Sequence, residues 1–317
     1  MKISDYRKAL IARFWEYQKE QFSDWQTYFE RPFSPDGRPP VFEKHTANHN
    51  VLMEPDISPD KQKDLLNEIP ESARHRWFRS MRSSQALAQS IFGNLKISDC
   101  LHYMGELLDE SGEPLFGKAE VTSENFSMEY VVDFLDEPRP TNVDGFISGD
   151  YQVAIECKFA ETEVGTCSRP RLKKRDPNYC DGNYTRQGER EERCPLTKSG
   201  VRYWEYVPKL FTWRNDTDLM PCPLHKNYQL VRNLLAACIR PGHSHSSKSG
   251  HVVLIYDERN PAFQGGGHGF IAFEETQAAL KVPSRLRKCS WQGITEHLRK
   301  KAGLEWLCEQ LALKYGL

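Results

Sequence analysis

The chain has no run of 18 apolar residues among its 317 positions, so the sequence predicts no membrane-spanning helix. Its first residues, Met1–Asp5, lead into an amphipathic pattern and not into the apolar core of a signal peptide. Nine cysteines without a secretory signal favour a reducing compartment, where thiols or metal ligands are commoner than disulfides. We therefore expect a soluble, cytoplasmic protein.

The chain also lacks a strong excess of either charge. Its formal net charge is −1, with 27% charged residues, so any surface that binds nucleic acid must be a local basic patch. No internal repeat or low-complexity tail occurs. The glycines at 265–267 are not followed by the Gly-Lys-Ser/Thr of a phosphate-binding loop.

Residues 142–158 form the most informative stretch, which reads as a β-hairpin around a short loop at 148–150. Side chains alternate between the two faces of a strand. On the second strand, one face carries Val153, Ile155 and Cys157, and the other carries Ala154, Glu156 and Lys158.

The loop length sets which residues of the hairpin face each other. A three-residue loop pairs Tyr151 with Ile147 and Ala154 with Asp144, so Asp144 becomes the diagonal neighbour of Glu156, with Cα atoms ~7–8 Å apart. A two-residue loop would turn Asp144 to the opposite face. The three-residue loop lets two carboxylates share one divalent ion, although a Glu-x-Lys triplet on an exposed strand is often only a solvated ion pair.

Asp144 followed by Glu156-Cys157-Lys158 resembles the PD-(D/E)xK nuclease superfamily, with Val143 in place of the usual Pro. The resemblance extends over roughly residues 80–260 and includes the Ser84-Gln85 and Gln229–Asn233 regions. It implies an α/β (α+β) fold with a central mixed sheet of four or five strands flanked by helices.

The resemblance also implies metal-dependent hydrolysis of DNA phosphodiesters. Asp144, Glu156 and the carbonyl of Cys157 would bind Mg²⁺ or Mn²⁺, and Lys158 would orient water or neutralise charge. Glu129, inside an expected strand at 126–134, would complete the metal shell, and Gln229 would position the phosphate. Polar residues on the first core helix often border the site in similar nucleases, which makes Gln85 and Glu106 further candidates.

Periodicity predicts the remaining elements. Helices are expected over residues 4–29, 77–92, 97–109, 224–237 and 294–315, with a buried strand at 251–256 and an additional strand at 268–273. We divide the chain into an N-terminal helical region at 1–80 and a nuclease-like domain at 81–317. The latter carries a cysteine-containing insertion at about 160–222.

The insertion has few apolar residues before Val201, so it needs help to fold. We predict that a structural metal is bound by Cys167, Cys180, Cys194 and Cys222. Both Zn²⁺ and, by analogy with related nucleases, a [4Fe–4S] cluster remain open. The spacing lacks paired C-x-x-C motifs, His225 is an alternative ligand, and four free thiols in a long loop are the simpler interpretation.

A basic run in the same insertion consists of Arg169, Arg171, Lys173, Lys174 and Arg175. Beside a site with two carboxylates, it would neutralise DNA phosphates, although it also fits a solvated loop. The expected partner is DNA, and a homodimer is left open. The alternatives to a nuclease are a catalytically inactive nucleic-acid binder and a zinc or iron–sulfur structural protein.

Overall fold

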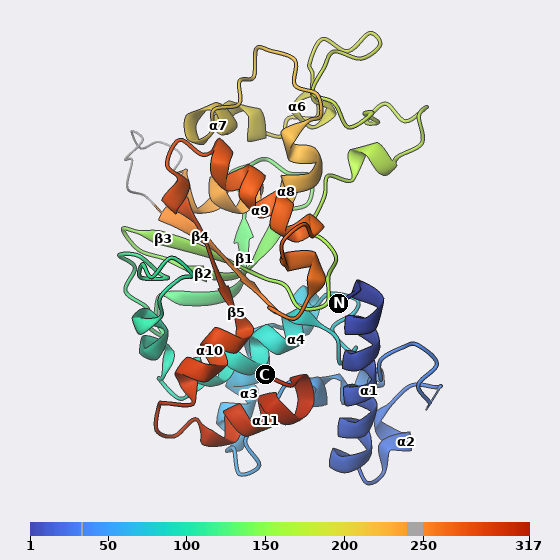
Figure 1. The fold of residues 1–317 in the computed structure, drawn as a ribbon, viewed down its shortest axis with the longest axis vertical. Coiled ribbons are helices and arrows are strands. Elements are labelled where there is room, and N and C mark those ends of the chain that lie inside the picture. Colours follow the sequence, from blue (N-terminus) through green and yellow to red (C-terminus); the bar gives the residue numbers. More distant parts are fainter. Residues whose placement is uncertain (33, 240–249) are drawn as a thin grey trace.

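The computed structural model describes residues 1–32, 34–239 and 250–317. Within these residues, five strands form one mixed sheet in the order β1-β2-β3-β4-β5 (Figure 1). The first three strands pair antiparallel, whereas β3, β4 and β5 run parallel. The strands are β1 (Phe126–Val132), β2 (Thr141–Ile147), β3 (Gln152–Cys157), β4 (Gly250–Tyr256) and β5 (Leu286–Ser290).

Helices cover both faces of this sheet, so the architecture is a three-layered α/β arrangement (Figure 1). No helix within the described ranges is both long and apolar enough to cross a bilayer. The helices are α1 (Ile3–Gln21), α2 (Trp25–Tyr28), α3 (Pro59–Asn67), α4 (Ser84–Ala88), α5 (Asn94–Ile97), α6 (Pro195–Lys198), α7 (Tyr203–Leu210), α8 (Pro223–Cys238), α9 (His268–Ala279), α10 (Trp291–Leu298) and α11 (Glu305–Tyr315).

Two apolar cores lie on opposite faces of the sheet. Val153, Ile155 and Cys157 of β3 belong to the first core, with side chains of α1, α10 and α11. Ala154 belongs to the second core, which is built largely from α7, α8 and α9. The predicted alternation of β3 is therefore confirmed, and the face that carries Glu156 is the one beneath α8.

The N-terminal region shares the first core with the sheet. Tyr6, Leu10 and Phe14 of α1 are buried in the same cluster as Ile155 and Tyr315. In Figure 1, α1 lies near α11 on the side of the sheet opposite α8. The division of the chain at residue 80 remains a prediction.

The fifth strand was placed wrongly from the sequence. Residues 268–273 begin α9, whose buried residues Gly269, Ala272, Phe273 and Thr276 have helical spacing. An apolar run of this length fits either a helix or a strand. The fifth strand is β5, whose sequence Leu-Arg-Lys-Cys-Ser is too polar to be recognised as one.

Four predicted helices are shorter than expected or divided. The expected helix at 4–29 consists of α1 and α2, and the C-terminal helix consists of α10 and α11. The expected helix at 97–109 contains only a short 3-10 turn, Leu101–Glu106. The helix expected at 77–92 is also divided, because a π-helical segment at Gln89–Gly93 separates α4 from α5.

The predicted hairpin register is wrong by two residues. The structure pairs Ile147 with Val153, Phe146 with Ala154 and Gly145 with Ile155. Residues 148–152 therefore connect the innermost pair, and Gln152 already belongs to β3 through its pairing with β4. Because the shift is an even number, it keeps every side chain on its predicted face. Continuing the register places Asp144 directly opposite Glu156, where we had expected a diagonal neighbour.

Candidate active site

Both strand ladders next to Asp144 are interrupted at this residue. On one side, β1 pairs with β2 at Met128–Gly145 and at Tyr130–Val143, but not at the intervening Glu129. Glu129 has φ +50°, a left-handed conformation that is uncommon for a non-glycine residue. Such a strained residue inside a strand is typical of functional sites.

The left-handed residue also changes which face β1 presents. Phe126 and Met128, before Glu129, belong to the first core. After it, Val132 belongs to the second core, and Tyr130 stacks on Phe146 of that core with ring centroids 4.1 Å apart. Strict alternation would have kept these four even-numbered residues on one face.

On the other side, the ladder between β2 and β3 ends at Gly145 and Ile155. Beyond it, the Cys157 amide donates to the side-chain Oδ2 of Asp144 at 2.7 Å. Because the N–H and C=O of an extended residue point to the same side of its strand, the Cys157 carbonyl also faces Asp144. The strands thus separate where the carboxylates lie.

Glu129, Asp144 and Glu156 therefore form an acidic row across three adjacent strands. Burial is the main cause that raises the pKa of Asp144 well above its usual value, and the charges of Glu156 and Glu129 raise it further. Lys158 and the Cys157 amide oppose this shift. Three carboxylates beside one lysine leave an excess of negative charge at this point of the sheet.

Glu156 and Lys158 form a buried ion pair beneath α8. Glu156 is fully buried and Lys158 is 7% exposed, with Lys158 Nζ 2.7 Å from Glu156 Oε1. Burial alone would lower the pKa of Lys158, but Glu156, Glu161 and Asp144 outweigh it and raise that pKa above its usual value. Lys158 is therefore an ammonium group at neutral pH.

Helix α8 supplies two amides to this pair. Asn233 Nδ2 donates to Glu156 Oε2 at 2.6 Å, and Gln229 Oε1 accepts from Lys158 Nζ at 3.1 Å. Residues four apart lie on the same side of a helix, so one face of α8 holds both charged groups. Gln229 was predicted to lie in the site, but the contact of Asn233 with Glu156 was missed.

Glu129 is bound by two further amides. Gln85 Nε2 donates to its Oε1 at 2.5 Å, and Asn142 Nδ2 donates to its Oε2 at 3.2 Å. Burial raises the pKa of Glu129, while these two hydrogen bonds lower it and Glu156 raises it. Gln85 of α4 thus borders the site, whereas Glu106 pairs instead with Lys301 at 2.5 Å.

Glu161 is a neighbour that the sequence interpretation missed. Its Oε2 accepts from the Phe159 amide at 2.6 Å, and its Oε1 accepts from Ser84 Oγ at 2.7 Å. Its charge contributes to the raised pKa of Lys158. Its position three residues after Lys158 was the only available signal.

The donor chemistry of the acidic row fits a divalent cation such as Mg²⁺. Such ions prefer carboxylate and carbonyl oxygens, which Asp144, Glu156 and the Cys157 carbonyl would provide, and a cation would offset the excess negative charge. In the described ranges, no three His, Cys, Asp or Glu side chains are already arranged to hold an ion. Glu156 Oε1 is paired with Lys158 instead.

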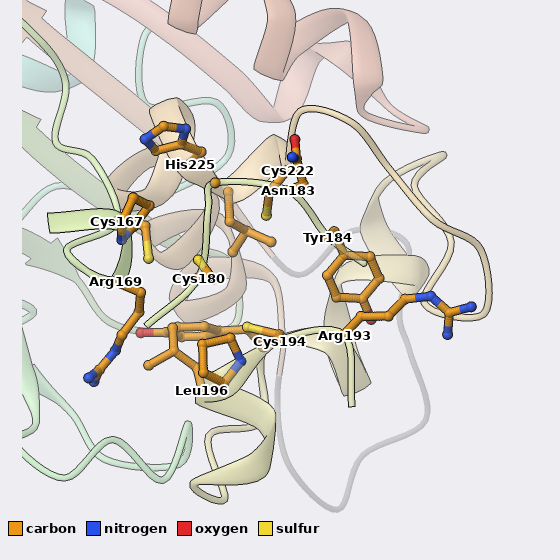
Figure 2. Close-up of a pocket in the computed structure, with 15 residues that line it drawn as sticks. Cys167, Arg169, Cys180, Asn183, Tyr184, Arg193, Cys194, Leu196, Cys222 and His225 are labelled. Atoms are coloured by element: carbon orange, nitrogen blue, oxygen red, sulfur yellow. The ribbon is translucent and has the colours of Figure 1, made fainter. Parts of the chain in front are cut away.

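The residues predicted in the insertion lie apart from the acidic row. Cys167, Cys180, Cys194 and Cys222 line one pocket, together with Arg169 and His225 (Figure 2). Arg171, on the turn Arg169–Arg171, pairs with Glu163 at 3.2 Å. The side chains of Lys173, Lys174 and Arg175 are exposed.

Comparison with known families adds a finding to this geometry. A family model described as "Restriction Endonuclease associating with ARP" matches residues 15–316. The chain belongs to this family. Neither a curated protein nor a solved structure matched the chain.

Membership of this restriction endonuclease family confirms the resemblance that rested on Asp144 and the Glu156–Lys158 triplet. The mixed five-stranded sheet flanked by helices confirms the predicted fold class. The match begins within α1 and ends in the last residues of the chain, so it includes the acidic row, α8 and the cysteine insertion.

Proposed function

We propose that the protein is a divalent-metal-dependent nuclease that hydrolyses DNA phosphodiesters at the acidic row. The observation that carries the proposal is the meeting of Asp144, Glu156 and Lys158 where β2 and β3 separate. Membership of a restriction endonuclease family supports DNA as the substrate.

Asp144, Glu156 and the Cys157 carbonyl are the groups that would hold the ion, with Glu129 beside them. A divalent ion at such a site activates water and stabilises charge on the phosphorus. Asn233 fixes Glu156 through its Oε2, and the Cys157 amide fixes Asp144 through its Oδ2. These contacts orient the two carboxylates before any ion arrives.

Lys158 acts in this proposal as a charge and a hydrogen-bond donor. In the metal-free structure, Glu156, Glu161 and Asp144 raise its pKa, so the proposal gives Lys158 the role of a cation and not that of the base. Gln229 Oε1 accepts one of its protons and limits the positions of the ammonium group. A second proton of Lys158 is directed at Glu156 Oε1, so one donor is left that can stabilise negative charge on the scissile phosphate.

The basic residues of the insertion are proposed to contact the DNA backbone. Lys173, Lys174 and Arg175 are exposed, so each can neutralise a phosphate without first breaking a buried contact. Arg169 is half-buried beside the cysteines, and Arg171 must leave Glu163 before it can contact DNA.

The test is cleavage of supercoiled plasmid and of single-stranded DNA with Mg²⁺ or Mn²⁺. We expect Asp144→Asn to lower the cleavage rate by roughly 100-fold or more. Loss of a residue that only hydrogen-bonds a metal ligand typically costs about 10–100-fold, and Asp144 is proposed to be a ligand itself. DNA binding should persist, because the change removes one negative charge. The matched control is Glu124→Gln, an exposed carboxylate just before β1.

Two results would contradict the proposal. One is wild-type cleavage by Asp144→Asn, which would place the chemistry elsewhere. The other is a wild-type protein that binds DNA but cuts neither substrate with either ion, which would leave a nucleic-acid-binding function. Addition of a chelator should stop cleavage by the wild-type protein and by Glu124→Gln alike.

A further inference from the structure

Residues 165–200, in the first part of the connection between β3 and α8, have little regular structure and few core residues. They contain only the turn Arg169–Arg171 and the four-residue helix α6. In the same range, the buried apolar side chains are Cys180, Tyr184, Pro195 and Leu196. A long irregular segment with so small a core needs another source of stability.

Four cysteines from separate parts of this segment meet in one pocket. Cys167, Cys180, Cys194 and Cys222 line a cavity of about 20 Å³, which has room for about one water-sized sphere or ion. All four are free thiols. Figure 2 shows the four sulfurs around a common space, with the ring of His225 at its edge.

The cysteines are close enough to influence one another electrostatically. Burial raises the pKa of Cys222, and Cys194, Cys167 and Cys180 raise it further. Burial raises the pKa of Cys167 to about 11, with smaller contributions from Cys180 and Cys194.

Backbone amides favour the thiolate form at three of the four positions. A backbone hydrogen bond from the residue two positions further on lowers the pKa of each sulfur: Arg169 for Cys167, Gly182 for Cys180 and Leu224 for Cys222. Burial outweighs these hydrogen bonds when no cation is present.

We propose that Cys167, Cys180, Cys194 and Cys222 bind one Zn²⁺ in a structural site. Four thiolates are a donor set that Zn²⁺ binds tetrahedrally. As noted above, no three ligands already have binding geometry in the described residues. Zinc must therefore draw the four stretches together.

Two chain segments connect this pocket with the part of α8 that lies against the acidic row. Cys222 immediately precedes α8, which carries Gln229 and Asn233. Near Cys167, a side chain at Gly165 would meet Gln229 Oε1 at 2.3 Å, and the Cys167 amide donates to the His225 carbonyl at 2.9 Å. Zinc would thus hold both chain segments that position Gln229 against Lys158.

The first test is the metal content of the purified full-length protein. We expect one zinc ion per chain and, after exchange with Co²⁺, the charge-transfer absorption of thiolate-bound cobalt. Cys194→Ser and Cys180→Ser should each lose the metal or bind it at least 100-fold more weakly. The matched control is Cys100→Ser, because Cys100 lies outside the pocket and should leave one zinc ion bound.

Several results would overturn the zinc site. Iron with visible absorption in an anaerobic preparation would indicate a cluster. A wild-type chain that binds neither Zn²⁺ nor Co²⁺ would leave only packed thiols. Zinc at unchanged affinity in both serine variants would show that the ligand set is wrong. None of these results depends on DNA cleavage, so the zinc site and the nuclease proposal can fail separately.

Discussion

Asp144→Asn should make the metal-free protein more stable while it removes activity. In the folded state, Asp144 lies between Glu129 and Glu156, and burial together with these charges raises its pKa. Asparagine keeps the shape and an oxygen that can accept from the Cys157 amide, which now donates to Oδ2. The substitution therefore removes the repulsion but preserves the main contact.

The expected gain can be estimated from this geometry. Two carboxylates ~5 Å apart, as for directly opposed strand residues, repel by about 3 kcal/mol at an effective dielectric constant of 20. Attraction by Lys158 offsets part of this repulsion. We expect a gain of about 1–3 kcal/mol in the free energy of unfolding at pH 7, which corresponds to about 2–4 °C in Tm per kcal/mol.

The pH dependence separates repulsion from other effects of the substitution. Because the folded-state pKa of Asp144 is raised, the native state binds more protons than the unfolded state above about pH 4. As the pH rises above about 4, the stability of the wild type should therefore fall relative to that of Asp144→Asn. The fall should be up to about 1.4 kcal/mol per pH unit, until the pH reaches the folded-state pKa of Asp144. Below about pH 4 the two curves should run parallel.

The assay is urea denaturation in a chelator at several pH values between 3 and 8, with Glu124→Gln as the control. Parallel curves over the whole range, or a less stable Asp144→Asn at pH 7, would refute the repulsion. Mg²⁺ at ten times its Kd should stabilise the wild type by about 1.4 kcal/mol. The same addition should stabilise Asp144→Asn less.

Three further predictions concern other charges. Lys158→Met leaves Glu156 buried without its cation and should cost about 3–5 kcal/mol in urea denaturation; Lys158→Met with Glu156→Gln should recover stability but not cleavage. Burial lowers the pKa of Lys314, which contacts Asn50, to about 7, so the unfolded state binds the extra proton above that pH. Wild-type stability should then rise relative to Lys314→Met between pH 7 and 10, by up to about 1.4 kcal/mol per unit, and parallel curves would contradict this. The three exposed cations of the basic run are Lys173, Lys174 and Arg175. Their replacement by alanine should weaken DNA binding and reduce the magnitude of the slope of log K against log salt by up to about 0.9 per phosphate contact. An unchanged slope would show that these three residues do not contact phosphates.

The elements that the sequence predicted best are those with local patterns. The apolar runs of β3 and β4 and the stripe of Leu230 and Leu234 on α8 identify their own structures, because burial on one face leaves a period in the sequence. The order of these elements with Asp144 and Glu156 was enough to place both carboxylates on one face.

The misjudged features depend on contacts that no local pattern records. The register of the hairpin rests on a five-residue connection at 148–152 with Gly149 at φ +142°, and several loop lengths fit the same sequence. The left-handed Glu129 shifts the face of β1, although glutamate has no preference for that conformation. Glu161 is held beside the site by hydrogen bonds from the Phe159 amide and from the Ser84 hydroxyl. Ser84 lies 77 residues away in the sequence, so no local pattern reveals this contact.

Helix α8 connects the two proposed metal sites physically. Its buried face includes polar residues, among them Asn233 at 0% and Arg232 at 4% exposure. Burial of such groups costs free energy unless each is hydrogen-bonded, and Arg232 Nη2 donates to the Asn142 carbonyl at 3.3 Å and to Asn233 Oδ1 at 3.2 Å. The free-energy cost of burying Arg232 is offset by these hydrogen bonds, which also position Asn233, the residue that holds Glu156. Because the helix begins directly after Cys222, the cysteine pocket and the side chains that hold Glu156 and Lys158 belong to one continuous segment of the chain.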